Sequence, residues 1–362
     1  MSGTFGNNYK VTIFGESHGE AIGVVIDGLP AGFTIDENNL KNNMERRAPG
    51  RDDFSTSRKE PDKVKIVSGF VKGKTTGTPL CALVENQAQM SKDYESIKRI
   101  IRPGHADYTG NIKFKGFEDF RGGGHFSGRI TLGLVIAGTI ARQYLELHGI
   151  KIGAHIARIS NINDCKLSGI TEDIELLDKL KDMDFPVIDS LSGEKMKEKI
   201  LEAKKNGDSV GGIIECKAIG LPAGIGDPFF NSLESTISLL VFSIPAVKGI
   251  EFGAGFEFAG MHGSEANDEF YLSNDVVKTR TNNNGGINGG ISNGMPVIFS
   301  VVVKPTPSIA AIQHSLTLND LVETELEIKG RHDACIVQRA VVVVESITAI
   351  ALMEHIGGTI SG

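Results

Sequence analysis

Tryptophan is absent from this chain of 362 residues, and aromatic residues make up only 6% of it. Cysteine is also scarce. The four cysteines lie far apart, with neither a C-x-x-C pair nor the spacing of a metal site: Cys81, Cys165, Cys216 and Cys335. This pattern excludes a disulfide-stabilised scaffold and a zinc-binding module. We therefore expect buried thiols in a reducing cytoplasm and no bound metal.

Long hydrophobic runs and an excess of positive charge are missing too. Residues 130–141 form an apolar run too short to span a bilayer, and Arg339 and Glu345 interrupt the run at 334–353. The N-terminus lacks the basic and apolar pattern of a signal peptide. A net charge of -7 leaves no large basic surface for a nucleic-acid backbone. We expect neither a membrane nor a nucleic acid as a partner.

The common nucleotide fingerprints are absent as well, although glycine is abundant. No G-x-x-x-x-G-K-[ST] run occurs, and no G-x-G-x-x-G set lies between a strand and a helix. The 44 glycines include glycine-rich stretches at 121–129 and 285–290. The first stretch opens a predicted helix, so its backbone N–H groups favour a phosphate. For a single run tight turns are the better explanation, but several such runs together with two turn histidines and Lys304 favour a phosphate-bearing ligand.

Arginines and histidines indicate the chemistry. Eight of the thirteen arginines fall between residues 46 and 129, and arginine suits phosphate and carboxylate groups. His18 and His105 each lie in a turn that contains glycine, and histidine exchanges protons near neutral pH. The pattern predicts acid/base catalysis on a small anionic substrate. Its alternative is a set of arginines that form ordinary surface ion pairs.

Hydrophobic periodicity predicts a mixed α and β protein. Strands are predicted at 10–14, 22–26, 63–71, 78–84, 211–219 and 296–303, and helices at 37–47, 94–101, 128–148, 174–180, 194–205, 228–242, 318–327 and 333–355. Small residues in the 128–148 helix predict close helix packing between layers. The charge-rich segment at about 161–208 is expected to be peripheral within a single domain that spans residues 1–362.

A pentapeptide, Gly-Leu-Pro-Ala-Gly, occurs twice, at 28–32 and 220–224. Each copy follows a predicted strand. This repetition is consistent with an internal duplication and a pseudo-twofold fold, although five common residues also recur by chance.

Short motifs throughout the chain resemble those of the chorismate synthase family, in order and in spacing. They are Gly-Glu-Ser-His-Gly at 15–19, Glu-Arg-Arg at 45–47, Arg-Pro-Gly-His-Ala-Asp at 102–107, Arg-Gly-Gly-Gly at 121–124, Ala-Val-Lys-Gly at 246–249, the glycines at 285–290, Lys-Pro-Thr at 304–306 and Gly-Arg-His-Asp at 330–333. The resemblance covers nearly the full length.

The resemblance implies an α+β fold, a β-α-β sandwich with helices packed between antiparallel sheets, and a cytoplasmic homotetramer. It also implies a lyase that converts 5-enolpyruvylshikimate 3-phosphate to chorismate by anti-1,4-elimination, with reduced FMN (FMNH2) required but not consumed. Some family members reduce flavin with NADPH, but here an external flavin reductant is expected. A flavin-dependent oxidoreductase and a non-enzymatic anion-binding protein are the alternatives.

Residue roles also follow from the resemblance. His18 would protonate the departing phosphate, His105 would protonate the reduced flavin, and Asp333 would accept the proton of flavin N5. Substrate contacts would come from Ser17, Arg46, Arg47, Arg129 and Arg331. Flavin contacts would come from His125, Phe126, Ser127, Ala246, Gly289, Lys304, Pro305, Thr306, Pro307, Ser308 and Arg331. Many family members have Arg-Ser at the position of His125 and Phe126, so this chain departs from the family there.

Overall fold

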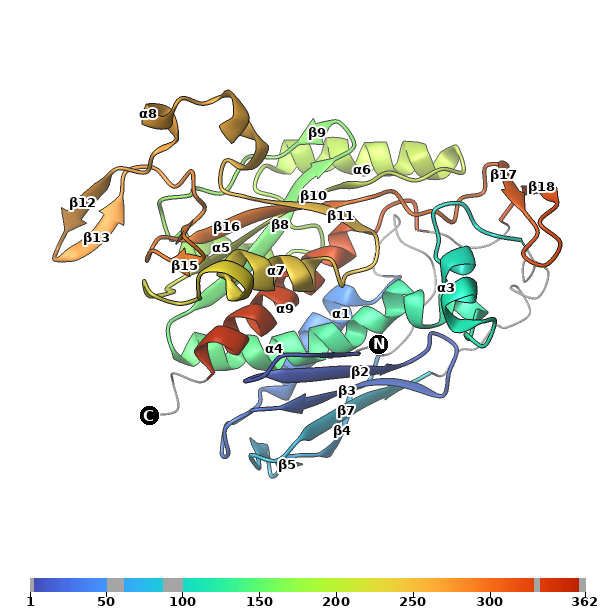
Figure 1. Cartoon of the computed structure of the whole chain (residues 1–362), viewed down its shortest axis with the longest axis horizontal. Helices are drawn as coiled ribbons and strands as arrows, with labels where there is room; N and C mark the ends of the chain where they lie inside the picture. The colour runs from blue at the N-terminus through green and yellow to red at the C-terminus, as the bar shows by residue number, and fades with distance from the viewer. Residues whose placement is uncertain (1–2, 51–61, 87–99, 329–332, 358–362) are drawn as a thin grey trace.

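Two five-stranded antiparallel sheets enclose a layer of helices (Figure 1). The computed structural model describes residues 3–50, 62–86, 100–328 and 333–357. The first sheet has the order β1 (Thr4–Phe5), β2 (Lys10–Gly15), β3 (Ala21–Asp27), β7 (Leu80–Glu85) and β4 (Lys65–Ser68). The second has the order β11 (Val247–Phe252), β16 (Val297–Val303), β10 (Gly212–Ile219), β8 (Lys151–Ile159) and β9 (Ile162–Asn163). The expected sandwich is confirmed.

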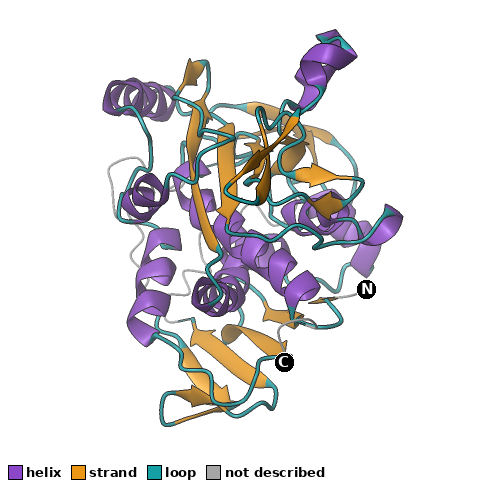
Figure 2. Ribbon diagram, turned by 90° about the vertical axis from the view of Figure 1, so that its left-hand side faces the viewer, coloured by secondary structure: helices purple, strands orange, loops and turns teal. Residues whose placement is uncertain are grey.

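The helices of the middle layer are α1 (Glu37–Arg47), α4 (Thr131–Leu147), α7 (Leu233–Val241) and α9 (Val337–Ile356). Figure 2 shows them between the two sheets. Residues 131–142 of α4 are all buried, as expected for a helix packed on several sides. A Cβ on Gly138 of α4 would lie 2.3 Å from Cβ of Ser346 in α9, so only glycine permits this approach. Among the described residues, no helix combines the length and apolarity needed to cross a membrane.

The remaining helices and strands lie around the two sheets and the helical layer. They are β5 (Phe70–Val71), β6 (Lys74–Thr75), α3 (Asp107–Phe114), α5 (Ile174–Lys181), α6 (Ser190–Lys205), α8 (Gly263–Ala266), β12 (Phe270–Ser273), β13 (Val276–Thr279), β14 (Ile287–Asn288), β15 (Ile291–Ser292), β17 (Gln313–Leu316) and β18 (Glu323–Leu326). In Figure 1 the β12–β13 hairpin projects from the body of the protein. Helix α5 packs on the outer face of the second sheet, where Leu177 contacts Gly153.

The two halves of the chain repeat one topology, which supports the duplication predicted from the pentapeptide. In the first half β2, β3, β7 and β4 are neighbours in that order, and in the second half β8, β10, β16 and β11 take the same places. The pentapeptide follows β3 in one half and β10 in the other. Helices α1 and α7 come next, and α4 and α9 close the two halves.

The two pentapeptides also make equivalent hydrogen bonds. Thr75 Oγ1 donates to the carbonyl of Pro30 at 2.6 Å, and Ser292 Oγ donates to the carbonyl of Pro222 at 2.6 Å. The last glycine of each copy donates its N–H to the backbone carbonyl of the same Thr75 or Ser292, at 2.8 and 2.9 Å. A chance repeat of five residues does not explain this agreement.

All six predicted strands are confirmed, with the segment at 63–71 divided into β4 and β5. Of the helices, six are confirmed, although α4, α7 and α9 begin three to five residues later than predicted. The helix at 318–327 is wrong. Leu321 has a positive φ of 54° there, and the following residues pair with β17 as strand β18. The helix at 94–101 lies almost wholly outside the described residues.

A buried ionic cluster attaches the segment at 160–211 to the second sheet. His155 is fully buried on β8, with Nδ1 at 3.0 Å from Asp164 Oδ2 and Nε2 at 3.0 Å from Glu215 Oε2. Glu215 also accepts the N–H of Leu167 at 2.6 Å, and Asp164 accepts the N–H of Ile188 at 2.6 Å. Burial opposes the charged imidazole, but the bonds to Asp164 and Glu215 outweigh it and raise the pKa of His155 above 6.5.

This cluster predicts a pH-dependent stability. Because the pKa of His155 is higher in the folded state, its contribution is fully present below pH 6.5 and is lost as the pH rises through the folded-state pKa. We expect His155→Gln to lower the free energy of unfolding by about 1.5–3 kcal/mol at pH 6. Urea denaturation of wild type and variant between pH 6 and 9 measures the difference, which should shrink at high pH. An equal change in His314→Gln, an exposed histidine, would contradict the assignment.

Candidate active site

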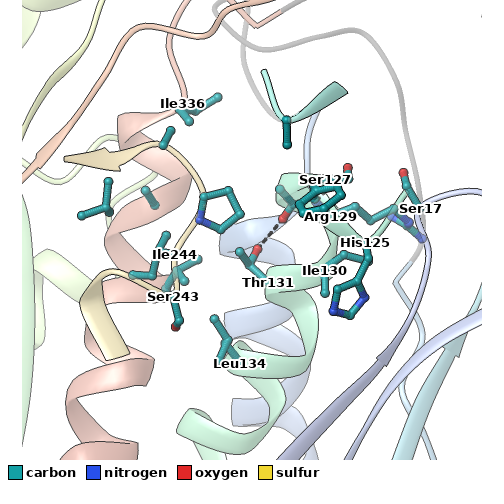
Figure 3. Close-up of a pocket in the computed structure, with 18 of the residues that line it drawn as sticks. Ser17, His125, Ser127, Arg129, Ile130, Thr131, Leu134, Ser243, Ile244 and Ile336 are labelled. Atoms are coloured by element: carbon teal, nitrogen blue, oxygen red, sulfur yellow. Dashed lines mark hydrogen bonds between the residues drawn. The ribbon is translucent and has the colours of Figure 1, made fainter. Parts of the chain in front are cut away.

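A cavity of about 1070 Å³ opens between α4, α9 and the end of β2. Figure 3 shows Ser17, His125, Ser127 and Arg129 on one side of it, with Ser243, Ile244 and Ile336 on the other. Its polar wall also includes Arg47, Arg102, His105, Lys304, Asp333 and Arg339. Its apolar wall includes Ile130, Leu134, Pro245, Val343 and Ile350. The cavity thus suits a ligand, or two ligands, with both charged and apolar parts.

The triple glycine at 122–124 separates two histidines. All three glycines have positive φ, of 59°, 84° and 53°. A Cβ on Gly122 would lie 2.5 Å from Nε2 of His18, and a Cβ on Gly123 would lie 3.2 Å from Nε2 of His105. Any side chain at Gly122 would therefore collide with His18. The glycines let both imidazoles approach the same loop.

The turn at 15–19 places His18 against this loop. Ser17 donates its backbone N–H to the carbonyl of Gly124 at 3.1 Å. The carbonyl of Gly15 accepts a hydrogen bond from Nδ1 of His125 at 2.9 Å. His18 itself is only 2% exposed. These two hydrogen bonds therefore join the turn at 15–19 to the glycine-rich loop at 121–129, which is distant in sequence, at one edge of the site.

His105 is oriented by two charged neighbours. Its Nδ1 lies 2.6 Å from Asp107 Oδ1, and Arg102 Nη2 donates to the same oxygen at 2.6 Å. Burial opposes ionisation of Asp107, but the hydrogen bonds from Arg102 and His105 outweigh it and lower the pKa of Asp107 far below 3.8. The ionised carboxylate accepts a hydrogen bond from Nδ1–H, which leaves Nε2 facing Gly123.

Three ion pairs involve residues of the polar wall. Asp62 binds Arg47 and also lies 3.0 Å from Arg129 Nη1. Asp333 Oδ2 accepts a hydrogen bond from Arg339 Nη1 at 2.7 Å. Nε of Arg47 is buried, and no described residue accepts its hydrogen. A buried donor of this kind favours an anion nearby.

The segment at 304–308 closes another wall. Two hydrogen bonds position Lys304. Its backbone N–H donates to the carbonyl of Ala246 at 2.9 Å, and its side-chain Nζ donates to the carbonyl of Gly104 at 2.5 Å. Thr306 Oγ1 donates to the carbonyl of Asp333 at 2.7 Å. These contacts join segments from both halves of the chain at the cavity.

Most of the predicted site residues meet at this cavity. The lining includes Ser17, Arg47, His105, His125, Phe126, Ser127, Arg129, Ala246, Lys304, Thr306, Pro307, Ser308 and Asp333. His18 lies directly behind Gly122. Their proposed roles remain predictions, because the structure contains no ligand.

Besides His18, three predicted residues are not among the described residues that line the cavity. Arg46 is not among the described lining residues; its guanidinium points into the helical layer and binds Glu345 at 2.6 Å. Pro305 and Gly289 are also not among them. Arg331 lies outside the described residues. Asp333 does line the cavity, but it is not a helix cap, because α9 begins at Val337 after Ile336.

Sequence reasoning missed four charged or polar groups that support the site: Asp62, Asn86, Asp107 and Arg339. Asp107 was within a quoted motif, two residues after His105, and the proximity of an acid to a histidine was the available signal. Asn86, Asp62 and Arg339 belong to no recognisable motif. Their positions become meaningful only when the chain is folded.

The comparisons with known proteins agree with one another. The family model of chorismate synthase matches residues 9–356. A chorismate synthase of Dehalococcoides mccartyi is 44% identical over 354 residues, which cover 98% of this chain and 96% of that protein. A chorismate synthase of Methanocaldococcus jannaschii is 45% identical, with the same coverage. A solved structure described as a crystal structure of chorismate synthase aligns with a TM-score of 0.77 and 26% identity, covering 99% of this chain and 94% of the other.

Proposed function

Because the chain belongs to the chorismate synthase family of lyases, we propose that it converts 5-enolpyruvylshikimate 3-phosphate to chorismate by anti-1,4-elimination of phosphate, with reduced FMN as cofactor. One observation carries the proposal: the two histidines meet at the triple glycine beside an arginine-lined cavity. Histidine supplies proton transfer and arginine binds the phosphate and carboxylates of such a substrate.

The cavity fits a flavin together with a substrate. Sites for one small molecule usually have volumes of about 300–1000 Å³, and this cavity has about 1070 Å³. Apolar residues such as Leu134 and Ile244 suit an aromatic ring system, while Lys304, Thr306 and Ser308 suit a phosphate. When bound, reduced FMN supplies transient electron donation to the substrate, with no net redox change.

The residues of this chain have the following proposed roles. His18, held behind Gly122, donates a proton to the oxygen of the departing phosphate. Arg47 and Arg129 bind anionic groups of the substrate. The carboxylate of Asp333 accepts a proton while its ion pair with Arg339 holds it at the cavity wall.

His105 is proposed to hold a proton toward the flavin, and Asp107 orients it. We expect Asp107→Asn to lower kcat by about 10- to 100-fold, because a neutral amide accepts a weaker hydrogen bond from Nδ1–H than an ionised carboxylate does. Steady-state assays and ¹⁵N NMR of the imidazole measure the effect. Unchanged kcat with an unchanged imidazole spectrum would remove Asp107 from this role.

An anaerobic assay tests the proposed function. The enzyme is incubated with 5-enolpyruvylshikimate 3-phosphate and chemically reduced FMN, and chorismate and phosphate are followed together. We expect equal amounts of both products, with many turnovers for each reduced flavin. Consumption of one reductant per turnover would instead indicate a flavin-dependent oxidoreductase. Absence of any turnover would leave an anion-binding protein.

We further propose a cytoplasmic homotetramer that receives electrons for its flavin from an external reductant, as the family resemblance implies. Two exposed phenylalanines shortly before α7, Phe229 and Phe230, support an assembly. Analytical ultracentrifugation measures the state directly, and a monomer at micromolar concentration would refute the tetramer.

A further inference from the structure

Two arginines and one aspartate form a buried cluster at the polar wall of the cavity. Arg47 ends α1, Arg129 precedes α4, and Asp62 comes shortly before β4. The side chains of Arg47, Asp62 and Arg129 are 3%, 2% and 9% exposed. Three segments of the first half of the chain thus meet at one point.

The carboxylate of Asp62 contacts both guanidinium groups, with one oxygen toward each. Oδ2 accepts a hydrogen bond from Arg47 Nη2, and Oδ1 lies 3.0 Å from Arg129 Nη1. Asn86 Oδ1 accepts a hydrogen bond from Arg129 Nε at 2.8 Å. A guanidinium has five N–H donors in a fixed plane, so bonds along one edge determine where the others point.

Electrostatics make this carboxylate necessary. Two guanidinium groups that share one partner repel each other, and burial increases the repulsion. Burial lowers the pKa of Arg47, and the charge of Arg339 lowers it further, whereas Asp62 raises it. Asp62 therefore offsets the cost of keeping two buried cations side by side.

Asp62 acts through the arginines, because Arg47 and Arg129 are among the described residues that line the cavity and Asp62 is not. We infer that Asp62 is a positioning residue whose carboxylate holds Arg47 and Arg129 together as one anion-binding unit, an inference that rests on the proposed function. The unit carries one net positive charge, which suits a phosphate or carboxylate of the substrate.

The first test replaces Asp62 with Asn and separates KM from kcat. We expect KM for 5-enolpyruvylshikimate 3-phosphate to rise about 10- to 100-fold, with a smaller change in kcat. Inorganic phosphate, titrated by calorimetry, should bind more weakly by a similar factor. Asp178→Asn is the matched control. Asp178 lies on α5, away from the cavity, and forms ion pairs with Lys151 of the second sheet and with Lys181 of α5. That control should leave both quantities unchanged.

Two results of this test would overturn the inference. Tighter phosphate binding by Asp62→Asn would mean that Asp62 competes with the ligand rather than positioning the arginines. Lower thermal stability with unchanged KM and unchanged phosphate affinity would mean that its role is structural.

A double-mutant cycle tests the coupling between Asp62 and Arg47 directly. The variant Arg47→Gln with Asp62→Asn removes one charge of each sign, so its charge balance is kept. Because Asp62 acts through its arginines, adding Asp62→Asn to Arg47→Gln should weaken phosphate binding less than it does in wild type. Full additivity of the two changes would refute the inference.

The phosphate measurement also separates this inference from the proposed function. If wild type makes no chorismate but Asp62→Asn still weakens phosphate binding, the proposed function fails and the anion-binding unit stands. If phosphate binding by wild type does not depend on Arg129, as tested by Arg129→Gln, the anion-binding unit itself is refuted.

Discussion

Replacing His18 with Asn is expected to lower kcat for chorismate formation by about 10²- to 10⁴-fold, the usual cost of removing a general acid. His18 is buried beside Gly122, at the corner formed by the turn at 15–19. Asn fits this space and keeps a polar group, but it does not deliver a proton to a departing phosphate. Rapid-mixing measurements of phosphate release at saturating substrate give the rate.

Flavin and substrate binding distinguish this loss from a general disruption of the site. FMN affinity of His18→Asn should remain close to that of wild type, because its proposed contact is with the phosphate. His148→Asn serves as the control, since His148 is exposed at the end of α4. If His18→Asn turns over within a few-fold of wild type, the proton comes from another group.

Replacing Glu345 with Ala is expected to lower the free energy of unfolding by about 3–5 kcal/mol, because it leaves two buried cations without their anion. Glu345 lies in the middle of α9 and is fully buried. It accepts hydrogen bonds from Arg46 at 2.6 and 3.0 Å and from Arg142 at 3.0 Å. It also accepts the N–H of Ala154, from the second sheet, at 3.3 Å. Urea denaturation at pH 7 measures the loss.

The acid response of the protein provides an independent check on Glu345. Burial alone would raise the pKa of this carboxyl, but the charge and hydrogen bonds of Arg46, together with the charges of Arg142 and Lys181, outweigh burial and lower the pKa below 4.5. Its contribution is therefore present above pH 4.5 and is lost as the pH falls through the folded-state pKa. Glu45→Ala is the control, since the side chain of Glu45 is 52% exposed and its pair with Lys41 is worth at most about 1 kcal/mol. A small change in Glu345→Ala would show that the helices repack without the charge.

Arg46 and Arg47 are adjacent in the chain, but only Arg47 is among the described residues that line the cavity. The family motif predicted that both Arg46 and Arg47 bind substrate anions. Successive residues of a helix point in different directions, and here Arg47 lines the cavity while Arg46 enters the helical layer. The motif therefore located the region correctly but did not say which side chain faces the ligand.

Local signals explain which elements were predictable. Helix α1 was predicted at its observed bounds, because Asp36 caps its start and Arg46 and Arg47 end it. Strand β8 was missed, because Gly153, His155 and Arg158 interrupt its apolar pattern. That strand is stabilised by buried contacts with Asp164, Glu215 and Glu345, all outside the strand, which no local pattern reveals.

The residues of the candidate site also differ in how far the sequence could predict them. His18, His105 and the triple glycine were visible because each lies within a short motif. Asp62 and Arg339 were not visible, because their importance comes from partners brought together by the fold. Sequence motifs thus identified the groups expected to touch ligands, whereas the groups that orient them required the structure.

The repeated strand order implies an evolutionary history. A half-length ancestor would have paired with its own copy, so that each copy supplied one sheet and two helices of the sandwich. Both copies would have carried the same corner after their first strand. In this chain the corner between β2 and β3 holds Ser17 and His18, while the equivalent connection, between β8 and β10, is the segment at 160–211 with α5 and α6. Fusion of the two copies would have kept one such corner at the cavity and allowed the other to lengthen into the segment that carries α5 and α6.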